Sequence, residues 1–474
     1  MDPKKNFITT KHIIYTLLVL CSIALSFTVF LPWPYNIAPF GVIIGLTIFI
    51  VNFKYPMIGV YLYMFIFFFN PQEFIPVELP YEKAIALMIL VVLFFKVAFR
   101  DKKFELYPMD KAFAAFMVVC FVSIMFAGDI ELAWDTFFKF FKVFLVYLFA
   151  SRLADTQKKF NTVIWIYLLS VVYIAVSVSL NYYIAGGAMN MGVERAGGFG
   201  EGGEDPNSIA NSLLLGIPFF YYLYRHYKNF YIRAFFVGIM LLSVWTIVLT
   251  GSRGGMLGVM VVAILLSLAT RYKIVTSFIA IMFIGVFLIA MPDQYKERFG
   301  TIFSVYDSND TTGANESAQG RIEGLVKGFV FLSQRPLFGV GIGNFKWQNR
   351  VQYGKWLDSH NLIGKLVGEL GIAGIISFGF FLYTIIATLQ MIKYIYHKYK
   401  WEYDFNWYLV EAIFYSLIIL AYQGLISHNL FRDNWYAIAC FVVIMSTLIK
   451  NRVELEKSRK HKELDVTDEL PQKI

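Results

Sequence analysis

Charged residues are scarce in this chain of 474 residues: Asp, Glu, Lys and Arg make up 16%, against about 25% in a typical soluble domain. Hydrophobic residues make up 58%, above the roughly 45–50% of soluble proteins. The apolar residues fall in blocks of roughly 15–25 residues, the length that spans a bilayer as a helix. The composition therefore excludes an ordinary soluble domain and predicts an all-α polytopic membrane protein.

Cysteine is also scarce, and the motifs of several enzyme classes are absent. The three cysteines, Cys21, Cys120 and Cys440, all lie inside apolar blocks, so a disulfide framework is not expected. The sequence shows no metal-ligating cluster, no nucleotide-binding glycine loop and no Ser/His/Asp triad. It also lacks the outward Asp-x-Asp pair of metal-dependent sugar-nucleotide transferases. We therefore predict neither a metal nor a cofactor.

The apolar blocks predict about 14 transmembrane helices, and a 12-span arrangement with two re-entrant segments is the alternative. No small-residue cleavage site follows the first block, about 13–31, which predicts a first span and not a signal peptide. The spans are centred near residues 22, 44, 63, 91, 119, 142, 172, 216, 241, 262, 282, 377, 417 and 440. We expect them to form a single transmembrane domain over residues 1–474.

The connections between spans alternate in charge. One set is basic, as at Arg100, Lys102 and Lys103, whereas the other set is uncharged at 31–37 or acidic, as at Glu73. Because basic loops stay in the cytoplasm, this pattern predicts that both termini are cytoplasmic. The formal net charge of +9 is then an orientation signal and implies no nucleic-acid partner.

One extracytoplasmic connection, residues about 292–360, is a large loop inserted within the domain. Apolar residues at helical spacing over Gly320–Leu332 predict a short amphipathic helix that lies on the membrane or caps the spans. The glycine-rich segment 336–343 predicts a packed turn. On the same side, the acidic glycine-rich segment 197–207 predicts a hinge, with Asn207 or Ser208 capping the next helix. A calcium site in that segment is the less favoured interpretation.

Candidate chemistry begins at Ser252-Arg253-Gly254-Gly255, a tight outward turn between two long apolar spans. Glycines let backbone amides approach a ligand, and a guanidinium group binds phosphate through two hydrogen bonds. Arg253 is therefore a phosphate-binding candidate, and an arginine that only reaches toward the membrane surface is the alternative. Arg321, at the start of the loop helix, is a second anion-binding candidate. Its alternative is a solvated helix face, with an ion pair to Glu323.

His360 lies where the loop enters a later span. Asp358 or Ser359 is predicted to cap that helix, which would place His360 in its first turn. The helix dipole and nearby arginines would keep the imidazole neutral, as a general base requires. A purely structural histidine is the alternative. The glycines that follow, four and three residues apart, predict a strip for close helix packing: Gly364, Gly368, Gly371 and Gly374.

Further polar residues carry weaker signals. Lys365 and Glu369, four residues apart, are expected to pair with each other. Lys139 and Lys142 either reach toward the membrane surface, which is favoured, or extend a phosphate site. The last outward turn has the residues Ser427-His428-Asn429 and Arg432-Asp433, for which a structural role is favoured over a place beside the same cavity.

At these residues the chain resembles the O-antigen ligase/polymerase family of bacterial envelope glycosyltransferases. Ser252-Arg253-Gly254 is similar to the family's Ser-Arg-Gly turn, and Arg321 with Leu325 fits its Arg-x3-Leu pattern. His360-Asn361, followed after nine residues by Gly371 and two residues later by Gly374, fits the ligase signature His-Asn-x9-Gly-x2-Gly. The resemblance covers about 195–390, and the first six spans carry no motif of the family.

The resemblance implies a GT-C-like helical glycosyltransferase that works without metal. Its donor would be a glycan on a polyprenyl-pyrophosphate carrier, and its acceptor a hydroxyl group of a lipid, a glycan or a protein. Arg253 and Arg321 would hold the diphosphate, and His360 would take the acceptor's proton during inverting transfer. The accessory candidates are Lys139, Lys142, Arg195, Asn361 and Glu369. The family also implies the bacterial cytoplasmic membrane, among membrane lipids, with the active site facing the periplasm.

Three alternatives stay open. An O-antigen or polysaccharide polymerase of the same family is less favoured than a ligase because the His-Asn-x9-Gly-x2-Gly element is present. A flippase or other transporter of lipid-linked glycans usually shows broken paired spans and polar groups near the membrane midplane. The outward residues here gather at the interface instead. A structural subunit of an envelope-synthesis complex would not need the two arginines and the histidine.

Overall fold

The computed structural model describes residues 38–69, 81–98, 106–190, 193–198, 205–300 and 314–468, together with scattered positions between 15 and 26. Two compact units, residues 1–104 and 105–474, are described separately. Helices dominate the described residues of both units. The described strands are the short antiparallel pair β1 (Ala188–Asn190) and β2 (Val193–Arg195).

The smaller unit contains three described helices, α2 (Ala38–Lys54), α3 (Pro56–Phe69) and α4 (Tyr81–Ala98), which pack on one another. Their sequences are almost wholly apolar, as a membrane environment requires. The predicted first span, centred near residue 22, lies largely outside the described residues.

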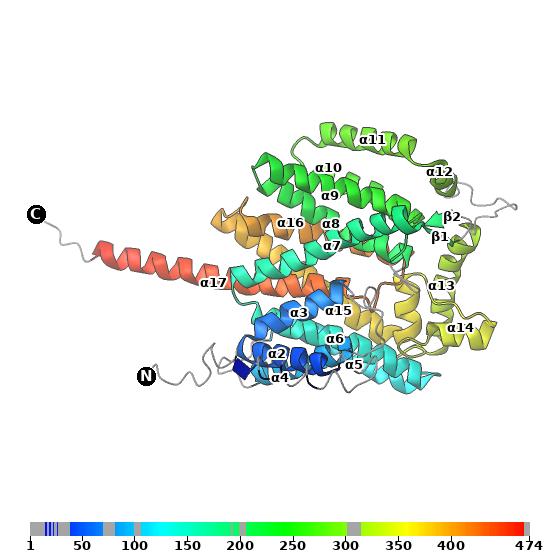
Figure 1. The fold of residues 1–474 in the computed structure, drawn as a ribbon, viewed down its shortest axis with the longest axis horizontal. Coiled ribbons are helices and arrows are strands. Elements are labelled where there is room, and N and C mark those ends of the chain that lie inside the picture. Colours follow the sequence, from blue (N-terminus) through cyan, green and yellow to red (C-terminus); the bar gives the residue numbers. More distant parts are fainter. Residues whose placement is uncertain are drawn as a thin grey trace, which may run out of the picture. The chain divides into compact units, whose positions relative to one another are not determined.

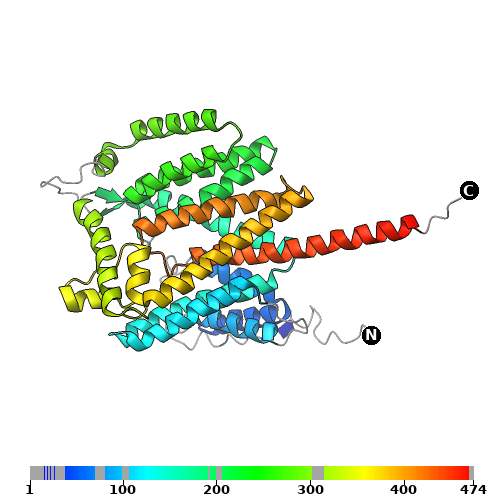
Figure 2. The ribbon, with the colours of Figure 1, turned by 180° about the vertical axis from the view of Figure 1, so that it is seen from behind.

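The larger unit is a bundle in which long helices run side by side and α17 projects beyond the others (Figures 1 and 2). Its helices are α5 (Pro108–Ser123), the 3₁₀ turn η3 (Ile124–Phe126), α6 (Ile130–Leu153), α7 (Gln157–Ala185), α8 (Pro206–His226), α9 (Phe230–Leu249), α10 (Arg253–Leu268), α11 (Lys273–Ala290), α12 (Asp293–Gly300), α13 (Ala314–Gln334), α14 (Phe345–Tyr353), α15 (Leu362–Tyr399), α16 (Phe405–Ile426) and α17 (Asn434–Asp468).

The structure confirms an all-α polytopic membrane fold. Six described helices are long and apolar enough to cross a membrane, and further apolar helices such as α10 and α11 are shorter. Every predicted span centre from residue 44 onward falls inside a described helix. The large loop contains α12, α13 and α14, as the prediction of helices within it requires. The number of helices that cross the membrane stays a prediction.

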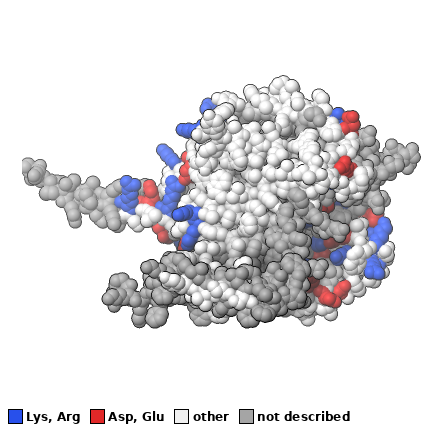
Figure 3. Space-filling model, in the orientation of Figure 1, with Lys and Arg blue, Asp and Glu red and all other residues white. Residues whose placement is uncertain are grey.

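Charge on the visible face of the larger unit is segregated. Lys and Arg predominate over Asp and Glu at the end from which α17 projects, both signs occur at the opposite end, and the helix surface between the two ends carries little of either (Figure 3). An uncharged band between two charged ends is what a membrane-spanning bundle needs. The distribution agrees with the charge pattern of the sequence, and the orientation itself stays a prediction.

Two small-residue contacts position the loop against the bundle. Helix α13 lies so close to the start of α15 that a Cβ atom added to Gly328 would sit 2.3 Å from the Gly364 carbonyl oxygen. A Cβ atom on Gly324 would likewise meet the Cα atom of Ser359 at 3.1 Å. The opposite face of α13 leaves Ile322 and other large apolar residues exposed. The amphipathic helix therefore packs on a span through its glycines and presents an apolar outer face.

Helix α15 is interrupted at Gly371, whose φ of 60° and ψ of −154° are not helical. The turn of residues 336–343 docks at this break. The Ile372 amide donates to the Pro336 carbonyl at 2.8 Å, and the Val340 amide donates to the Gly368 carbonyl at 2.9 Å. A Cβ atom on Gly371 would lie 2.5 Å from the Pro336 oxygen, so glycine is required. The predicted helix-packing role is therefore wrong for Gly371, which breaks the helix.

Candidate functional site

A polar cavity of about 410 Å³ opens in the larger unit where several chain segments meet. We call it the polar cavity. The start of α8, the turn before α10, helix α13, the segment before α15 and the turn after α16 all contribute to its walls. The lining residues are Asp205, Asn207, Asn211, Ser252, Gly254, Gly320, Arg321, Leu357, His360, Ile426, Ser427, His428 and Arg432.

The Ser-Arg-Gly turn forms one wall of the polar cavity. Ser252 caps α10, because its hydroxyl oxygen accepts a hydrogen bond from the Gly255 amide at 3.1 Å. The same hydroxyl donates to the Asn207 side-chain oxygen at 2.9 Å. Arg253 is 9% exposed and is not among the lining residues, although Ser252 and Gly254 on either side of it are. Its role as a diphosphate ligand therefore stays a prediction.

Arg195 is hydrogen-bonded to this turn and does not face the polar cavity. Its side chain is 3% exposed, and its Nε donates to the Thr250 carbonyl at 2.7 Å. Its Nη2 donates to the Asn207 side-chain oxygen at 3.3 Å. Burial lowers the pKa of Arg195, and the neighbouring Arg253 lowers it further, whereas Asp205 raises it. This accessory candidate thus fixes the turn and the start of α8, and it does not line the polar cavity.

Arg321 reaches the polar cavity from α13. Its Nε donates to the Ile426 carbonyl at 3.0 Å, which holds the guanidinium at the negative end of α16. Burial lowers the pKa of Arg321. The alternative ion pair with Glu323 is not formed, because that carboxylate pairs with Lys327 at 3.2 Å and Lys355 at 3.6 Å.

The residues on either side of His360, Asp358 and Asn361, hold its segment in place through hydrogen bonds. Asn361 caps α15, since its side-chain oxygen accepts a hydrogen bond from the Gly364 amide at 2.6 Å. His360 therefore precedes the cap, and the prediction that it lies in the first helical turn is wrong. The physical reason is competition for Asp358, whose carboxylate accepts from the Ser359 amide at 2.8 Å and from Lys365 at 2.6 Å.

His360 is half-buried and lines the polar cavity. Burial lowers the pKa of His360, opposed by Asp358 and Asp205, while Arg321 and Lys365 lower it further. The imidazole is therefore neutral near pH 7 and can accept a proton. Its ring centroid lies 5.7 Å from that of His428, which comes from the turn after α16.

The predicted ion pair Lys365–Glu369 forms, but each of the two residues has shorter contacts with other groups. Lys365 lies 3.6 Å from Glu369 and only 2.6 Å from Asp358. Glu369 is fully buried and accepts hydrogen bonds from the amides of Gly343 at 2.8 Å and Phe345 at 3.1 Å. This accessory candidate thus holds the turn between α13 and α14 and does not line the polar cavity.

Lys139 and Lys142 lie on the surface of α6. The Lys139 side chain is 71% exposed and pairs with Asp135 at 2.6 Å, and Lys142 is also exposed. Neither residue lines the polar cavity. An extension of the phosphate site by these lysines therefore receives no support from the structure and stays a prediction.

The sequence did not single out Asp205, Asn207 or Asn211 as residues of the site. For the last outward turn it favoured a structural role, whereas the structure places Ser427, His428 and Arg432 in the lining of the polar cavity. Asp205 caps α8 by accepting from the Ser208 amide at 3.2 Å, so the predicted cap at Asn207 or Ser208 is wrong. The missed signal is the proline that follows Asp205, because proline is favoured at the first position of a helix. Arg432 donates to the Ser208 hydroxyl at 2.6 Å and so joins α8 to the last turn.

The electrostatics of the polar cavity favour an anion. Helices α8, α10 and α15 all begin beside it, and the positive ends of helix dipoles attract negative charge. Arg321 and Arg432 line it, and Asp205 is the single carboxylate among its described lining residues. Such a cavity can hold the negative charge of a phosphate group, and the neutral histidine beside it can accept a proton. Together these properties suit a reaction in which a phosphate is the leaving group.

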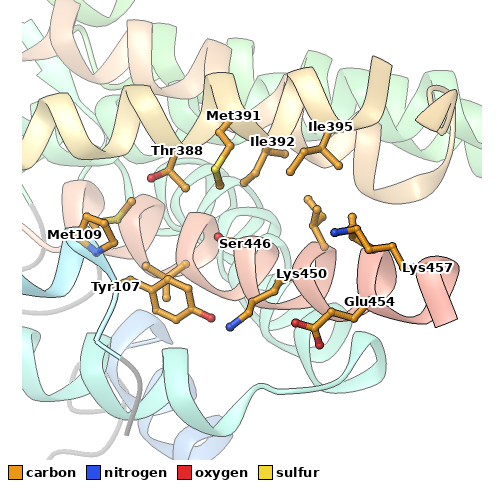
Figure 4. Close-up of a pocket in the computed structure, with 14 residues that line it drawn as sticks. Tyr107, Met109, Thr388, Met391, Ile392, Ile395, Ser446, Lys450, Glu454 and Lys457 are labelled. Atoms are coloured by element: carbon orange, nitrogen blue, oxygen red, sulfur yellow. The ribbon is translucent and has the colours of Figure 1, made fainter. Parts of the chain in front are cut away.

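A second cavity, of about 470 Å³, lies between α15, α17 and the start of α5 (Figure 4). We call it the apolar cavity. Met391, Ile392 and Ile395 of α15 form one wall, and α17 forms the other. The charged residues among its lining residues are Lys450, Glu454 and Lys457, all on α17.

The sequence profile of a family described as O-antigen ligase matches residues 238–379. Residues 238–379 are thus similar to O-antigen ligases. The match confirms the resemblance to the O-antigen ligase/polymerase family. Residues 37–228 match a family of unknown function, and a search of curated proteins gives no match.

The segment that matches the O-antigen ligase family, residues 238–379, supplies only part of the polar cavity. It contributes Ser252, Arg321 and His360. Asn207 and Asn211 come from the segment that matches the family of unknown function, whereas His428 and Arg432 follow residues 238–379. The cavity is therefore assembled from three stretches of sequence.

Proposed function

We propose that this protein is a glycosyltransferase that moves a glycan from a polyprenyl-pyrophosphate carrier to an acceptor hydroxyl group. One observation carries the proposal: Arg321, the Ser252 turn and His360, far apart in sequence, line the same polar cavity. A family of O-antigen ligases supports glycan transfer as the reaction class. The donor, the inversion and the independence of metal are parts of the proposal.

The residues divide the reaction between them. His360 accepts the proton of the acceptor hydroxyl as its oxygen forms a bond to the anomeric carbon. The bond from that carbon to the diphosphate oxygen breaks, and its electron pair leaves with the diphosphate. Arg321 and the helix N-termini at the polar cavity stabilise the charge of this leaving group, with Arg253 beside them. Attack opposite the leaving group inverts the anomeric centre.

The proposed setting is the bacterial cytoplasmic membrane, with both termini in the cytoplasm and the polar cavity facing outward. Single cysteines in place of Lys355 and Lys400, both exposed, test the orientation. In intact cells an impermeant thiol reagent should label the Lys355 site and spare the Lys400 site. The opposite labelling pattern would reverse the proposed orientation.

Purified protein in lipid nanodiscs, given a pyrophosphate-linked glycan donor and candidate acceptors, tests the reaction. We expect a new glycosidic linkage and release of the carrier diphosphate in equal amounts. Single attachment to a lipid or protein would identify a ligase, whereas lengthening glycans would identify a polymerase. Translocation of the donor across liposomes without any transfer would overturn the proposal in favour of a transporter.

A further inference from the structure

His428 is the second histidine of the polar cavity. It lies in the turn between α16 and α17, and its ring centroid is 5.7 Å from that of His360. A structural histidine usually hydrogen-bonds a neighbouring group through a ring nitrogen. Here Nδ1 is buried without a hydrogen-bond partner, and no described residue hydrogen-bonds Nε2. Local structure therefore does not account for this side chain.

The two ring nitrogens of His428 differ in their surroundings. Nδ1 is enclosed by protein, whereas Nε2 is not among the enclosed atoms, so the ring meets the polar cavity on the Nε2 side. A buried lone pair without a partner is tolerated more often than a buried N–H without one. The proton of the neutral ring therefore belongs on Nε2.

The surroundings also disfavour a second proton on this ring. The pKa of His428 is lowered to about 3, chiefly by burial and then by Lys365, Arg432 and His360, against the opposing effect of Asp358. With Nδ1 enclosed and Nε2 carrying the proton, the ring can donate a hydrogen bond to a ligand and cannot take a proton from one. His360 and His428 therefore suit opposite tasks.

The partner of a donated hydrogen bond must be an oxygen, and in this cavity an anionic oxygen is favoured. Arg321 and Arg432 line the polar cavity together with His428, and three helices begin beside it. We propose that His428 donates a hydrogen bond from Nε2 to a diphosphate oxygen of the lipid-linked donor. This inference rests on the proposed function and adds a ligand-binding residue to it.

The hydrogen bond strengthens as the reaction proceeds. When the bond between the anomeric carbon and the diphosphate oxygen breaks, its electron pair moves to the diphosphate, which becomes a better acceptor. His428 keeps its proton throughout, and the acceptor's proton goes to His360. Because the same group also binds the diphosphate before the reaction, its removal should weaken binding as well as turnover.

Inorganic pyrophosphate tests the inference without any transfer reaction. Its affinity is measured by calorimetry for the purified full chain, for His428→Ala and for His428→Gln. Glutamine keeps an N–H donor near the position of Nε2. We expect His428→Ala to weaken binding about tenfold or more, the scale of a hydrogen bond to a charged group, and His428→Gln to stay within about threefold. His397→Ala, an exposed histidine paired with Glu402 at 2.6 Å, is the matched control and should bind normally.

Thermal unfolding of each variant separates loss of fold from loss of binding. If His428→Ala and His428→Gln fold and bind pyrophosphate as the unmodified protein does, the inference is wrong. Equal weakening in both variants, or no binding by the unmodified protein, also overturns it. Transfer with normal pyrophosphate binding by His428→Ala would refute the inference and leave the proposed function intact. Binding that depends on His428, without transfer to any acceptor, would refute the proposed function alone.

Discussion

The polar cavity and the apolar cavity differ in chemistry far more than in size. Their volumes are about 410 and 470 Å³, so volume does not distinguish a reaction site from a space between helices. Five segments converge on the polar cavity with amides, hydroxyl groups, arginines and histidines. The apolar cavity draws mainly on two long helices, and its charged residues lie on α17 alone (Figure 4). Convergence of different polar groups from distant segments is the feature that marks a candidate site.

The largest contrast should come from His360→Ala. Removing a general base typically lowers the rate by about 10²–10⁴, while donor binding should change little because the arginines remain. The measurement is glycan transfer by purified protein alongside donor binding. Met391→Ala in the apolar cavity is the control and should transfer normally. Near-normal turnover by His360→Ala would remove this residue from catalysis.

Substitutions of the arginines should have the next largest effect and should differ from that of His360. Arg321→Ala should weaken donor binding and turnover together, by roughly tenfold to a hundredfold, because a hydrogen bond to a charged group is lost. Arg253→Lys keeps the charge but loses the planar two-pronged donor, so it should also be impaired. Lys139→Ala on the exposed surface of α6 is the matched control. An Arg253→Lys variant with normal donor affinity would show that the buried guanidinium only supports the turn.

The pH dependence of transfer should report His360. Its pKa is lowered from 6.5, chiefly by burial, so the proton-accepting form is present at neutral pH. As pH falls, transfer should decline with a midpoint below 6.5, because protonation removes the base. His428, whose pKa is about 3, contributes nothing to that midpoint. The profile of kcat/KM against pH checks this expectation, and a midpoint above 6.5 would contradict it.

Two changes should have the smallest effect on transfer. Ile392→Ala in the apolar cavity removes a fully buried side chain, so thermal stability should fall while transfer by the folded protein stays within about twofold. A strong loss of transfer without loss of stability would show that the apolar cavity also has a functional role. The two cavities would then no longer differ in function.

Chelation should also leave transfer unchanged. In the proposed site, Arg321 and the helix N-termini balance the diphosphate charge. Transfer is measured with and without EDTA, followed by addition of divalent ions. Loss in EDTA that a divalent ion restores would show that a metal shares this task.

The sequence predicted the helices and part of the site because these depend on local pattern. Apolar blocks indicate spans directly, and Arg321 and His360 lie in short motifs of a known family. The predicted cap of α15 was wrong because it depends on competition between side chains. Lys365 takes the Asp358 carboxylate, so Asn361 caps α15 instead.

The remaining cavity residues depend on tertiary structure. Asn207 and Arg432 reach the polar cavity only because α8 packs against α16 and because Arg432 bonds to Ser208. Gly371 matched the family motif, yet sequence spacing could not show that a turn docks on it and opens α15. Such contacts join residues 28 or more positions apart, so no local pattern records them.

The origin of the polar cavity in three stretches of sequence has a consequence for exchange between relatives. A chimaera that received only residues 238–379 from another protein with a similar segment would take the histidine base and the α13 arginine from that protein. It would keep the recipient's Asn207, Asn211 and Arg432, which line the same cavity. Substrate preference in such a hybrid should follow both parents. A transplant that keeps the whole cavity would have to carry the start of α8 and the turn before α17 along with residues 238–379.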